Sequence, residues 1–156
     1  MTYVVGIDPG PMVGMVGFEA TWATRSLAPV VIQCSWNAFD DVLAAIVIGD
    51  TVIAVERFVL APISSRANTP GAGRATRVVV ERCKRYAEIR LLQCFERNAA
   101  EVKPWATDAR LEVAGLLAPT KGMRHARDAA RHALFAAVKD CGLTDPLSKR
   151  GGGAHG

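Results

Sequence analysis

Apolar residues dominate the chain from residue 3 to residue 18, with only one short break. Tyr3 to Ile7 form a run of β-branched and apolar residues that predicts a buried β-strand, and this run closes on Asp8. Pro9-Gly10 is typical of a tight turn. The small apolar residues that follow predict a second strand, which runs back beside the first.

Later apolar runs predict three more extended segments. Residues 29–35 predict a third strand, and residues 51–55 predict a fourth that closes on Glu56. Residues 89–95 alternate in part and predict a fifth strand, followed by a short apolar segment at 99–102. The opening order is therefore three strands, a helix and a strand.

Helical periodicity predicts four helices. They are expected at residues 37–48, 75–87, 107–117 and 123–138. Asn37 and Thr107 are suited to be the N-caps of the first and third, because their side chains accept hydrogen bonds from backbone N–H groups of a first turn. In the last helix apolar residues form one continuous stripe, and His125, Asp128 and His132 fall together beside it.

The chain has 156 residues, half of them apolar, which suits one domain with a sizeable core. We expect this domain to span residues 1–145 and residues 146–156 to form a flexible tail, because SKRGGGAHG lacks core-forming residues. No run of eighteen apolar residues and no signal-peptide pattern occur, so we expect a cytoplasmic protein. The four cysteines show no CxxC spacing and are expected to be reduced core residues.

Charge divides the chain unevenly. Residues 1–56 carry one basic and six acidic side chains, whereas residues 57–131 carry fifteen basic and seven acidic ones. Arginine outnumbers lysine by 14 to 5, and its planar guanidinium suits bidentate contacts to phosphate. The simplest interpretation is a solvated surface. A basic stretch beside clustered carboxylates favours nucleic acid instead.

Three acidic residues lie at positions where a carboxylate favours a cationic partner. Asp8 alone is equally well explained as a turn residue that hydrogen-bonds the backbone ahead of it. Glu56 closes a buried strand, where a carboxylate is costly unless it is paired or binds a metal. Asp128 lies on the last helix with His125 one turn before it. The three together favour a shared site.

These motifs resemble the RuvC family of Holliday-junction resolvases. The resemblance rests on GIDPG at 6–10, Glu56 and His125-Ala-Arg-Asp128-Ala129, in the order and at about the spacing of that family. It implies an α/β, RNase H-like fold, in which a mixed central sheet with antiparallel first three strands and then parallel strands is flanked by α-helices. Actin-like and sugar-kinase-type ATPases also begin with a strand, Asp and Gly, but they need a second lobe. The short chain suggests a phage-type member.

The resemblance implies a crossover junction endodeoxyribonuclease that leaves 5′-phosphate and 3′-hydroxyl ends. Two Mg²⁺ or Mn²⁺ ions per active site would be held by Asp8, Glu56, His125 and Asp128. Many family members have a carboxylate where His125 stands, and a neutral imidazole suits Mn²⁺ better than Mg²⁺. Whether His125 ligates a metal or transfers a proton is open. Lys103, in AAEVK, matches a family residue beside the scissile backbone and is expected to be catalytic.

The implied partners are a four-way DNA junction and a second copy of the chain, with no nucleotide cofactor and no membrane. Candidate DNA-binding residues are Arg57, Phe58, Arg66, Arg74, Arg77, Lys103, Arg110, Lys121 and Arg124. Phe58 would stack on bases at a branch, or it folds back onto the core. Each of these lysine and arginine side chains could instead simply face solvent, without binding DNA. Apolar residues 78–80 within a basic helix suit a subunit contact, although a monomer's surface helix would look the same.

Three other functions stay open at this stage. One is a broader branched-DNA or flap nuclease, because the loop aromatic matches the family poorly. Another is a protein that binds junctions without cleaving them, if His125 marks a degraded site. The third is a nuclease that acts on RNA in hybrids. The intact carboxylates favour a junction-cleaving enzyme over the second of these.

Overall fold

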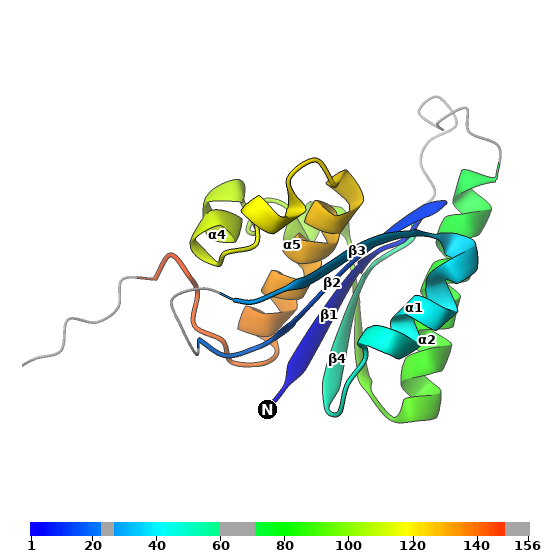
Figure 1. Ribbon diagram of the computed structural model, residues 1–156, viewed down its shortest axis with the longest axis horizontal. Coiled ribbons are helices and arrows are strands. Elements are labelled where there is room, and N and C mark those ends of the chain that lie inside the picture. The colour runs from blue at the N-terminus through cyan, green and yellow to red at the C-terminus, as the bar shows by residue number, and fades with distance from the viewer. Residues whose placement is uncertain (23–26, 60–70, 149–156) are drawn as a thin grey trace, which may run out of the picture.

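A computed structural model describes residues 1–22, 27–59 and 71–148, and its centre is a five-stranded β-sheet (Figure 1). The strands are β1 (Tyr3–Asp8), β2 (Met12–Glu19), β3 (Val30–Ser35), β4 (Thr51–Glu56) and β5 (Gln93–Arg97). They lie in the order β3-β2-β1-β4-β5. β2 is antiparallel to β1 and β3, whereas β4 is parallel to β1 and β5. This is the mixed sheet that the sequence predicts.

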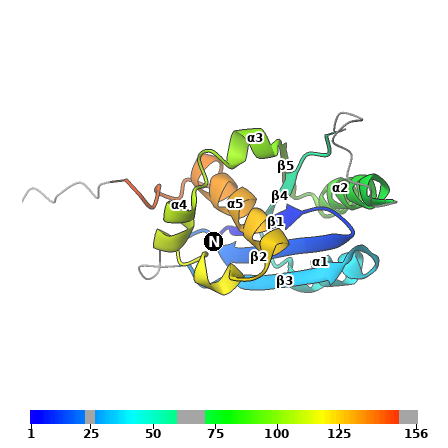
Figure 2. The ribbon, with the colours of Figure 1, turned by 90° about the horizontal axis from the view of Figure 1, so that it is seen from above.

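Helices cover both faces of this sheet (Figures 1 and 2). α1 (Phe39–Ile46) and α2 (Ala72–Arg90) lie on one face, and α5 (Arg124–Lys139) lies across the other. α3 (Ala99–Val102), α4 (Asp108–Val113) and the 3₁₀ helix η3 (Ala118–Thr120) contact α5, while η1 (Trp36–Ala38) leads into α1. None of the helices in the described part of the chain is long and apolar enough to span a membrane.

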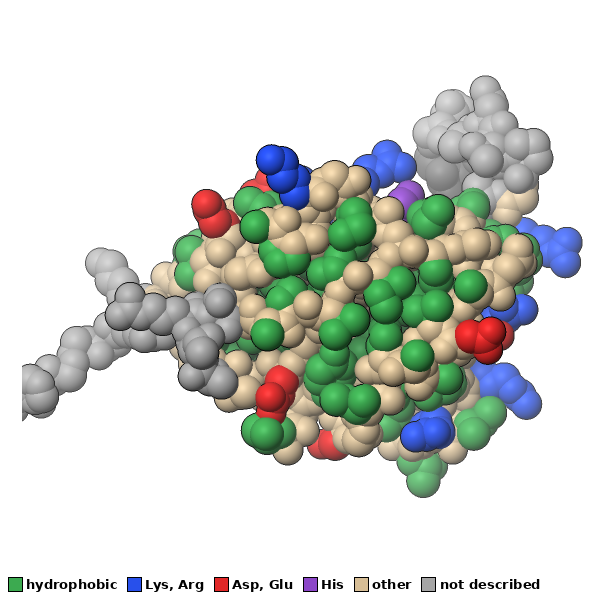
Figure 3. Space-filling view, viewed as in Figure 1, with side chains coloured by type: hydrophobic (Ala, Val, Ile, Leu, Met, Phe, Trp, Pro, Cys, Tyr) green, Lys and Arg blue, Asp and Glu red, His purple; other side chains and the backbone are tan. Residues whose placement is uncertain are grey.

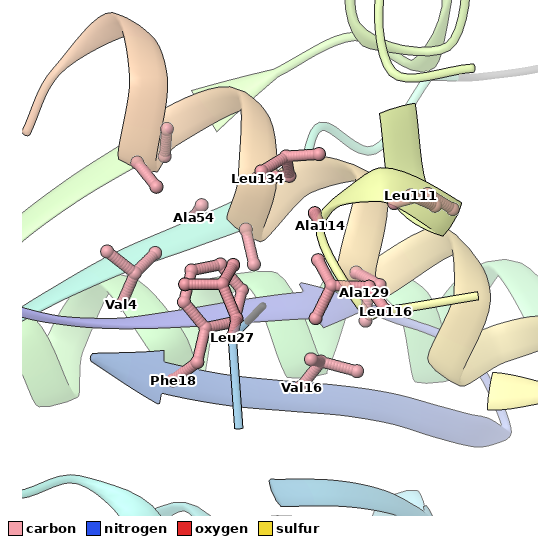
Figure 4. Packing of buried hydrophobic residues seen from close by; sticks show 14 of the residues in the cluster. Val4, Val16, Phe18, Leu27, Ala54, Leu111, Ala114, Leu116, Ala129 and Leu134 are labelled. Carbon is pink, nitrogen blue, oxygen red and sulfur yellow. The ribbon is translucent and has the colours of Figure 1, made fainter. Parts of the chain in front are cut away.

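The predicted alanine stripe of α5 is the contact between this helix and the sheet. Figure 4 shows Ala129 and Leu134 of α5 beside Val16 and Phe18 of β2, and all four side chains are fully buried. The helix lies so close that a Cβ atom on Gly6 of β1 would overlap the backbone of α5. Small residues on both sides therefore set the distance between α5 and the strands that end at the candidate site.

α2 packs its apolar face against the opposite side of the sheet. Val79 and Val80 are buried there together with Cys83 and Ala87. The apolar residues 78–80 were the sequence-based support for a subunit contact. Val79 and Val80 instead complete the protein's own core, so they give that contact no support.

The boundary between α2 and β5 differs from the prediction. α2 continues to Arg90 and β5 begins at Gln93, so the strand predicted at 89–95 starts too early. Ile89 and Leu91 suggested a strand, but their side chains are 67% and 93% exposed at the end of the helix. Leu91 ends α2 in the left-handed conformation, with φ 54°.

Two helix boundaries also differ from the prediction. Ser35, rather than Asn37, caps the first helical segment through its side chain. Thr107 caps α4 as predicted, but this helix ends at Val113 because the chain turns at Gly115, where φ is 78°. The four cysteines are free; Cys83 is buried and the other three are partly buried.

Candidate active site

Asp8 and Glu56 end two neighbouring parallel strands. Ile7 of β1 pairs with Val55 of β4, so the carboxylates that follow these residues emerge at the same edge of the sheet. Asp8 is 8% exposed, and Glu56 is partly buried. The sheet therefore brings together two acidic side chains that are 48 positions apart in the sequence.

The first turn of α5 reaches the same edge because residues of β2 and β3 contact its backbone directly. Gly14 of β2 has no side chain, and a Cβ atom there would collide with the backbone of His125. Gln33 of β3 accepts hydrogen bonds through Oε1 from the backbone N–H groups of His125 (3.0 Å) and Ala126 (3.2 Å). The side chain of Met123, at the N-cap, makes no capping hydrogen bond. Gln33 therefore caps α5 from a neighbouring strand.

The side chain of His125 contacts the carboxylate of Asp8. A hydrogen bond of 2.8 Å joins Nδ1 of His125 to Oδ2 of Asp8. The pKa of Asp8 is raised to about 6, chiefly by burial and also by the nearby carboxylates of Glu56 and Asp128, against the lowering effect of its hydrogen bond with His125. The three acidic residues predicted from the sequence thus act on one another electrostatically.

Asp128 lies one helical turn after His125 and is paired with two cations. Nζ of Lys103, which ends α3, lies 3.1 Å from Oδ2 of Asp128. Nε of Arg131 lies 3.6 Å from Oδ1. The structure thus brings Lys103 to the predicted site.

Glu56 faces a histidine that the sequence analysis left out of the site. Nε2 of His132 lies 3.3 Å from Oε2 of Glu56, and His132 is only 2% exposed. Burial favours the neutral form of Glu56, but His132 and the charge of Lys103 outweigh it, so the pKa of Glu56 is lowered. The carboxylate is therefore ionised at neutral pH.

The carboxylates of Asp8, Glu56 and Asp128 suit a hard divalent cation, although each of them now contacts a basic side chain. Among the described residues, no three His, Cys, Asp or Glu side chains already converge on a single metal position. Each of the three carboxylates is instead paired with a separate basic side chain. Oε2 of Glu56 is buried and has no hydrogen-bond partner in the described part of the chain. Carboxylate oxygens suit Mg²⁺ or Mn²⁺, so a bound cation would take the place of Lys103 beside Asp128.

A cleft of about 480 Å³ opens beside Glu56. Its lining includes Arg57, Phe58 and Asn98. Phe58 is half-buried against the core on the α2 side, and the guanidinium of Arg77 lies 5.8 Å from its ring centroid. Phe58 therefore packs on the core, as the alternative interpretation had it, and also borders the site. Arg57 is exposed and pairs with Glu96 at 3.6 Å.

A groove of about 370 Å³ lies on the other side of Asp128. Arg124, Arg127 and Arg131 line it, and the exposed Lys121 lines the neighbouring groove with Arg127. Figure 3 shows lysine and arginine side chains and a histidine at the upper edge of the molecule, with charges mostly around the rim of this face. Basic side chains thus flank the acidic centre on both sides.

Arg110 is the predicted site residue that the structure holds elsewhere. Its guanidinium binds Asp145 at 3.0 and 3.1 Å and donates to the backbone carbonyl of Trp105, with the Trp105 ring 4.6 Å away. Each of its three nitrogens already has a partner within the protein, so its placement gives no support to the predicted contact with DNA. Arg74 is exposed on α2, and Arg66 lies outside the described residues.

Sequence reasoning missed Gln33 and His132. Gln33 is a polar residue within the apolar strand VVIQCS, which is a signal that could have been followed. His132 falls on the same side of α5 as His125 and Asp128, but the pattern did not show that it would be buried against Glu56.

Comparison of the sequence with protein-family models and with curated proteins finds no match. Among solved structures, the fold is similar to that of T. thermophilus RuvC in complex with Holliday junction substrate. The TM-score is 0.59 and the identity 18%, and the match covers 94% of this chain and all of the other. The RNase H-like fold of the RuvC type is thereby confirmed, and at this identity the likeness concerns the fold alone.

Proposed function

We propose that this protein is a metal-dependent endonuclease of the RuvC type that nicks four-way DNA junctions. One observation carries the proposal. Asp8, Glu56, His125 and Asp128 come from three distant segments, yet they meet at one edge of the sheet, where the carboxylates influence one another's charge. A bound divalent cation would neutralise such a group of carboxylates.

The proposed metal ligands are these same four side chains. Two bound divalent ions would supply an activated water for attack on phosphorus and would stabilise the leaving 3′ oxygen, which gives 5′-phosphate and 3′-hydroxyl ends. Lys103, now paired with Asp128, would turn to the phosphate when a cation takes its place. Gln33 and Gly14 hold the start of α5, which carries His125 and Asp128, close to β2 and β3.

Branched DNA is the proposed substrate. The basic groove beside Asp128 and the cleft with Arg57 and Phe58 lie on either side of the acidic centre. They suit a backbone that runs through the site and a base that stacks near it. The structural neighbour was solved with a Holliday junction substrate, which supports this choice.

We further propose that two copies act together, so that paired nicks fall symmetrically on opposite strands. Ile89 and Leu91, exposed at the end of α2, are apolar surface that a second copy would cover. Sedimentation of the full chain across micromolar concentrations tests this. A dimer mass is expected, and a monomer mass throughout would overturn this part of the proposal.

The test of function is cleavage of a labelled four-way junction beside a replication fork, a flap, a linear duplex and an RNA–DNA hybrid, each with Mg²⁺ or Mn²⁺. Nicks confined to the junction are expected. Comparable cutting of forks and flaps would favour a broader debranching nuclease. Cutting of the hybrid alone would identify a nuclease acting on RNA.

A second candidate function is junction binding without cleavage. It is favoured by the pairing of each carboxylate with a basic side chain, since these pairs satisfy the acidic group without a metal. Tight junction binding with no metal-dependent cutting in the same assay would select it.

A further inference from the structure

His132 lies on α5 directly against the carboxylate of Glu56. Its Nε2 atom is 3.3 Å from Oε2, and the residue is 2% exposed. It comes one helical turn after Asp128, and its neighbours on the helix, Ala129 and Ala133, belong to the buried stripe. An imidazole therefore occupies a buried position among small apolar residues of the helix.

Neither atom of this contact has another partner. Within the described residues, Nε2 of His132 and Oε2 of Glu56 are both buried and make no hydrogen bond, so their present alignment is poor. A buried polar atom without a hydrogen bond costs roughly 1–3 kcal/mol. An apolar side chain at position 132 would leave one polar atom fewer to satisfy. The histidine is therefore explained by what it does to Glu56.

We propose that His132 is a positioning residue, whose Nε2–H donates to Oε2 of Glu56 and so turns Oε1 toward the open cleft. Glu56 lines that cleft with Phe58 and Asn98, and Oε1 is the oxygen that would ligate a metal. The inference rests on the proposed function. Groups behind a ligand fix its orientation in this way in other metal sites, and their removal weakens metal binding. His132 does not itself ligate, because its side chain is 1% exposed and lies behind the carboxylate.

Two substitutions separate this role from simple packing. His132→Gln keeps an N–H donor near the position of Nε2, whereas His132→Leu fills the space without a donor. Leu134→Val, a fully buried change on the same helix, is the control for loss of packing. Chemical unfolding of each variant establishes that it is folded before binding is measured.

Mn²⁺ binding to the full chain without DNA, followed by calorimetry, is the readout. We expect His132→Leu to bind Mn²⁺ about 10–100-fold more weakly, and both His132→Gln and Leu134→Val to stay close to wild type. In a Glu56→Gln background, His132→Leu should add no further loss, because the two side chains act as one unit.

Wild-type affinity in His132→Leu would overturn the inference. So would an affinity in His132→Gln as low as in His132→Leu, or an undiminished effect of His132→Leu in the Glu56→Gln background. If the wild-type protein bound no Mn²⁺, the proposed function would fail and the inference with it. If the wild type bound Mn²⁺ and the His132 variants bound it equally well, the inference alone would fail.

Discussion

At the scale of single residues, Asp8 shows the cost of building this site. Its carboxylate is buried at the end of β1 near two others, and its pKa is raised to about 6 from the ordinary 3.8. A carboxyl whose folded pKa is raised binds its proton more tightly in the folded protein than in the unfolded one. The contribution of Asp8 to the free energy of unfolding is therefore fully present below about pH 4 and is lost as the pH rises through about 6.

Asp8→Asn should consequently stabilise the metal-free protein at pH 8, by roughly 1–3 kcal/mol. At pH 4 the variant should be about as stable as wild type, because Asp8 is then neutral. Urea unfolding with EDTA at both pH values measures this, and Asp41→Asn, at an exposed carboxylate of α1, is the control. A loss of stability at pH 8 would contradict the account of Asp8.

We expect His125 to set the metal preference. A neutral imidazole favours Mn²⁺ over Mg²⁺, so the wild-type protein should cleave with Mn²⁺ at least as fast as with Mg²⁺. His125→Asp should shift the ratio of the two rates toward Mg²⁺. Initial rates on one labelled junction, at matched ion concentrations, provide the comparison. An unchanged ratio would rule against His125 as a ligand.

At the scale of elements, the placement of α5 depends on a cap from another strand. Gln33 accepts from two N–H groups of the first turn, and loss of such an acceptor costs about 0.5–2 kcal/mol. Gln33→Leu should therefore lower the free energy of unfolding by that amount and also slow cleavage, because His125 and Asp128 lie in this turn. Gln33→Glu keeps an oxygen acceptor and should retain most of both. Equal behaviour of the two variants in unfolding and in cleavage would contradict the capping role.

The end of α2 gives a prediction that is independent of the site. Leu91 is left-handed and 93% exposed, and asparagine adopts this conformation with less strain. Leu91→Asn should raise the free energy of unfolding by up to about 1 kcal/mol, and Leu91→Ala, which keeps the strain, should not. Thermal unfolding of dilute protein measures this. A lower stability of Leu91→Asn would show that the exposed side chain makes a contact worth more than the strain.

At the scale of the whole molecule, sequence patterns predict individual strands and helix faces, but they do not predict the contacts between distant elements. The buried strand before Asp8, the strand before Glu56 and the alanine stripe of α5 follow from periodicity, whereas the placement of the first turn of α5 also depends on Gly14 and Gln33. The contact of His132 with Glu56 depends on how α5 is set against β4, which no pattern within either element encodes. The ion pair of Arg110 with Asp145 is likewise not encoded in a local pattern, because Asp145 lies 35 residues further along the chain.

The distribution of charge over the whole molecule supports the proposed nuclease function better than any single contact does. The acidic centre lies at the carboxyl ends of β1 and β4, and basic side chains flank it in the cleft and in the groove. A phosphate backbone entering between them would bring its own negative charge to the carboxylates. We therefore expect cleavage to depend on a cation, and we expect the loss of Asp8 to abolish it.

The most direct test is the nicking of a four-way junction labelled in each strand, by wild type and by Asp8→Asn, with Mn²⁺ and with EDTA. We predict paired nicks at symmetric positions with wild type and Mn²⁺ only, while Asp8→Asn still binds the junction but leaves it intact. Cleavage that persisted in Asp8→Asn, or in EDTA, would contradict the assignment of this site as the metal-dependent centre.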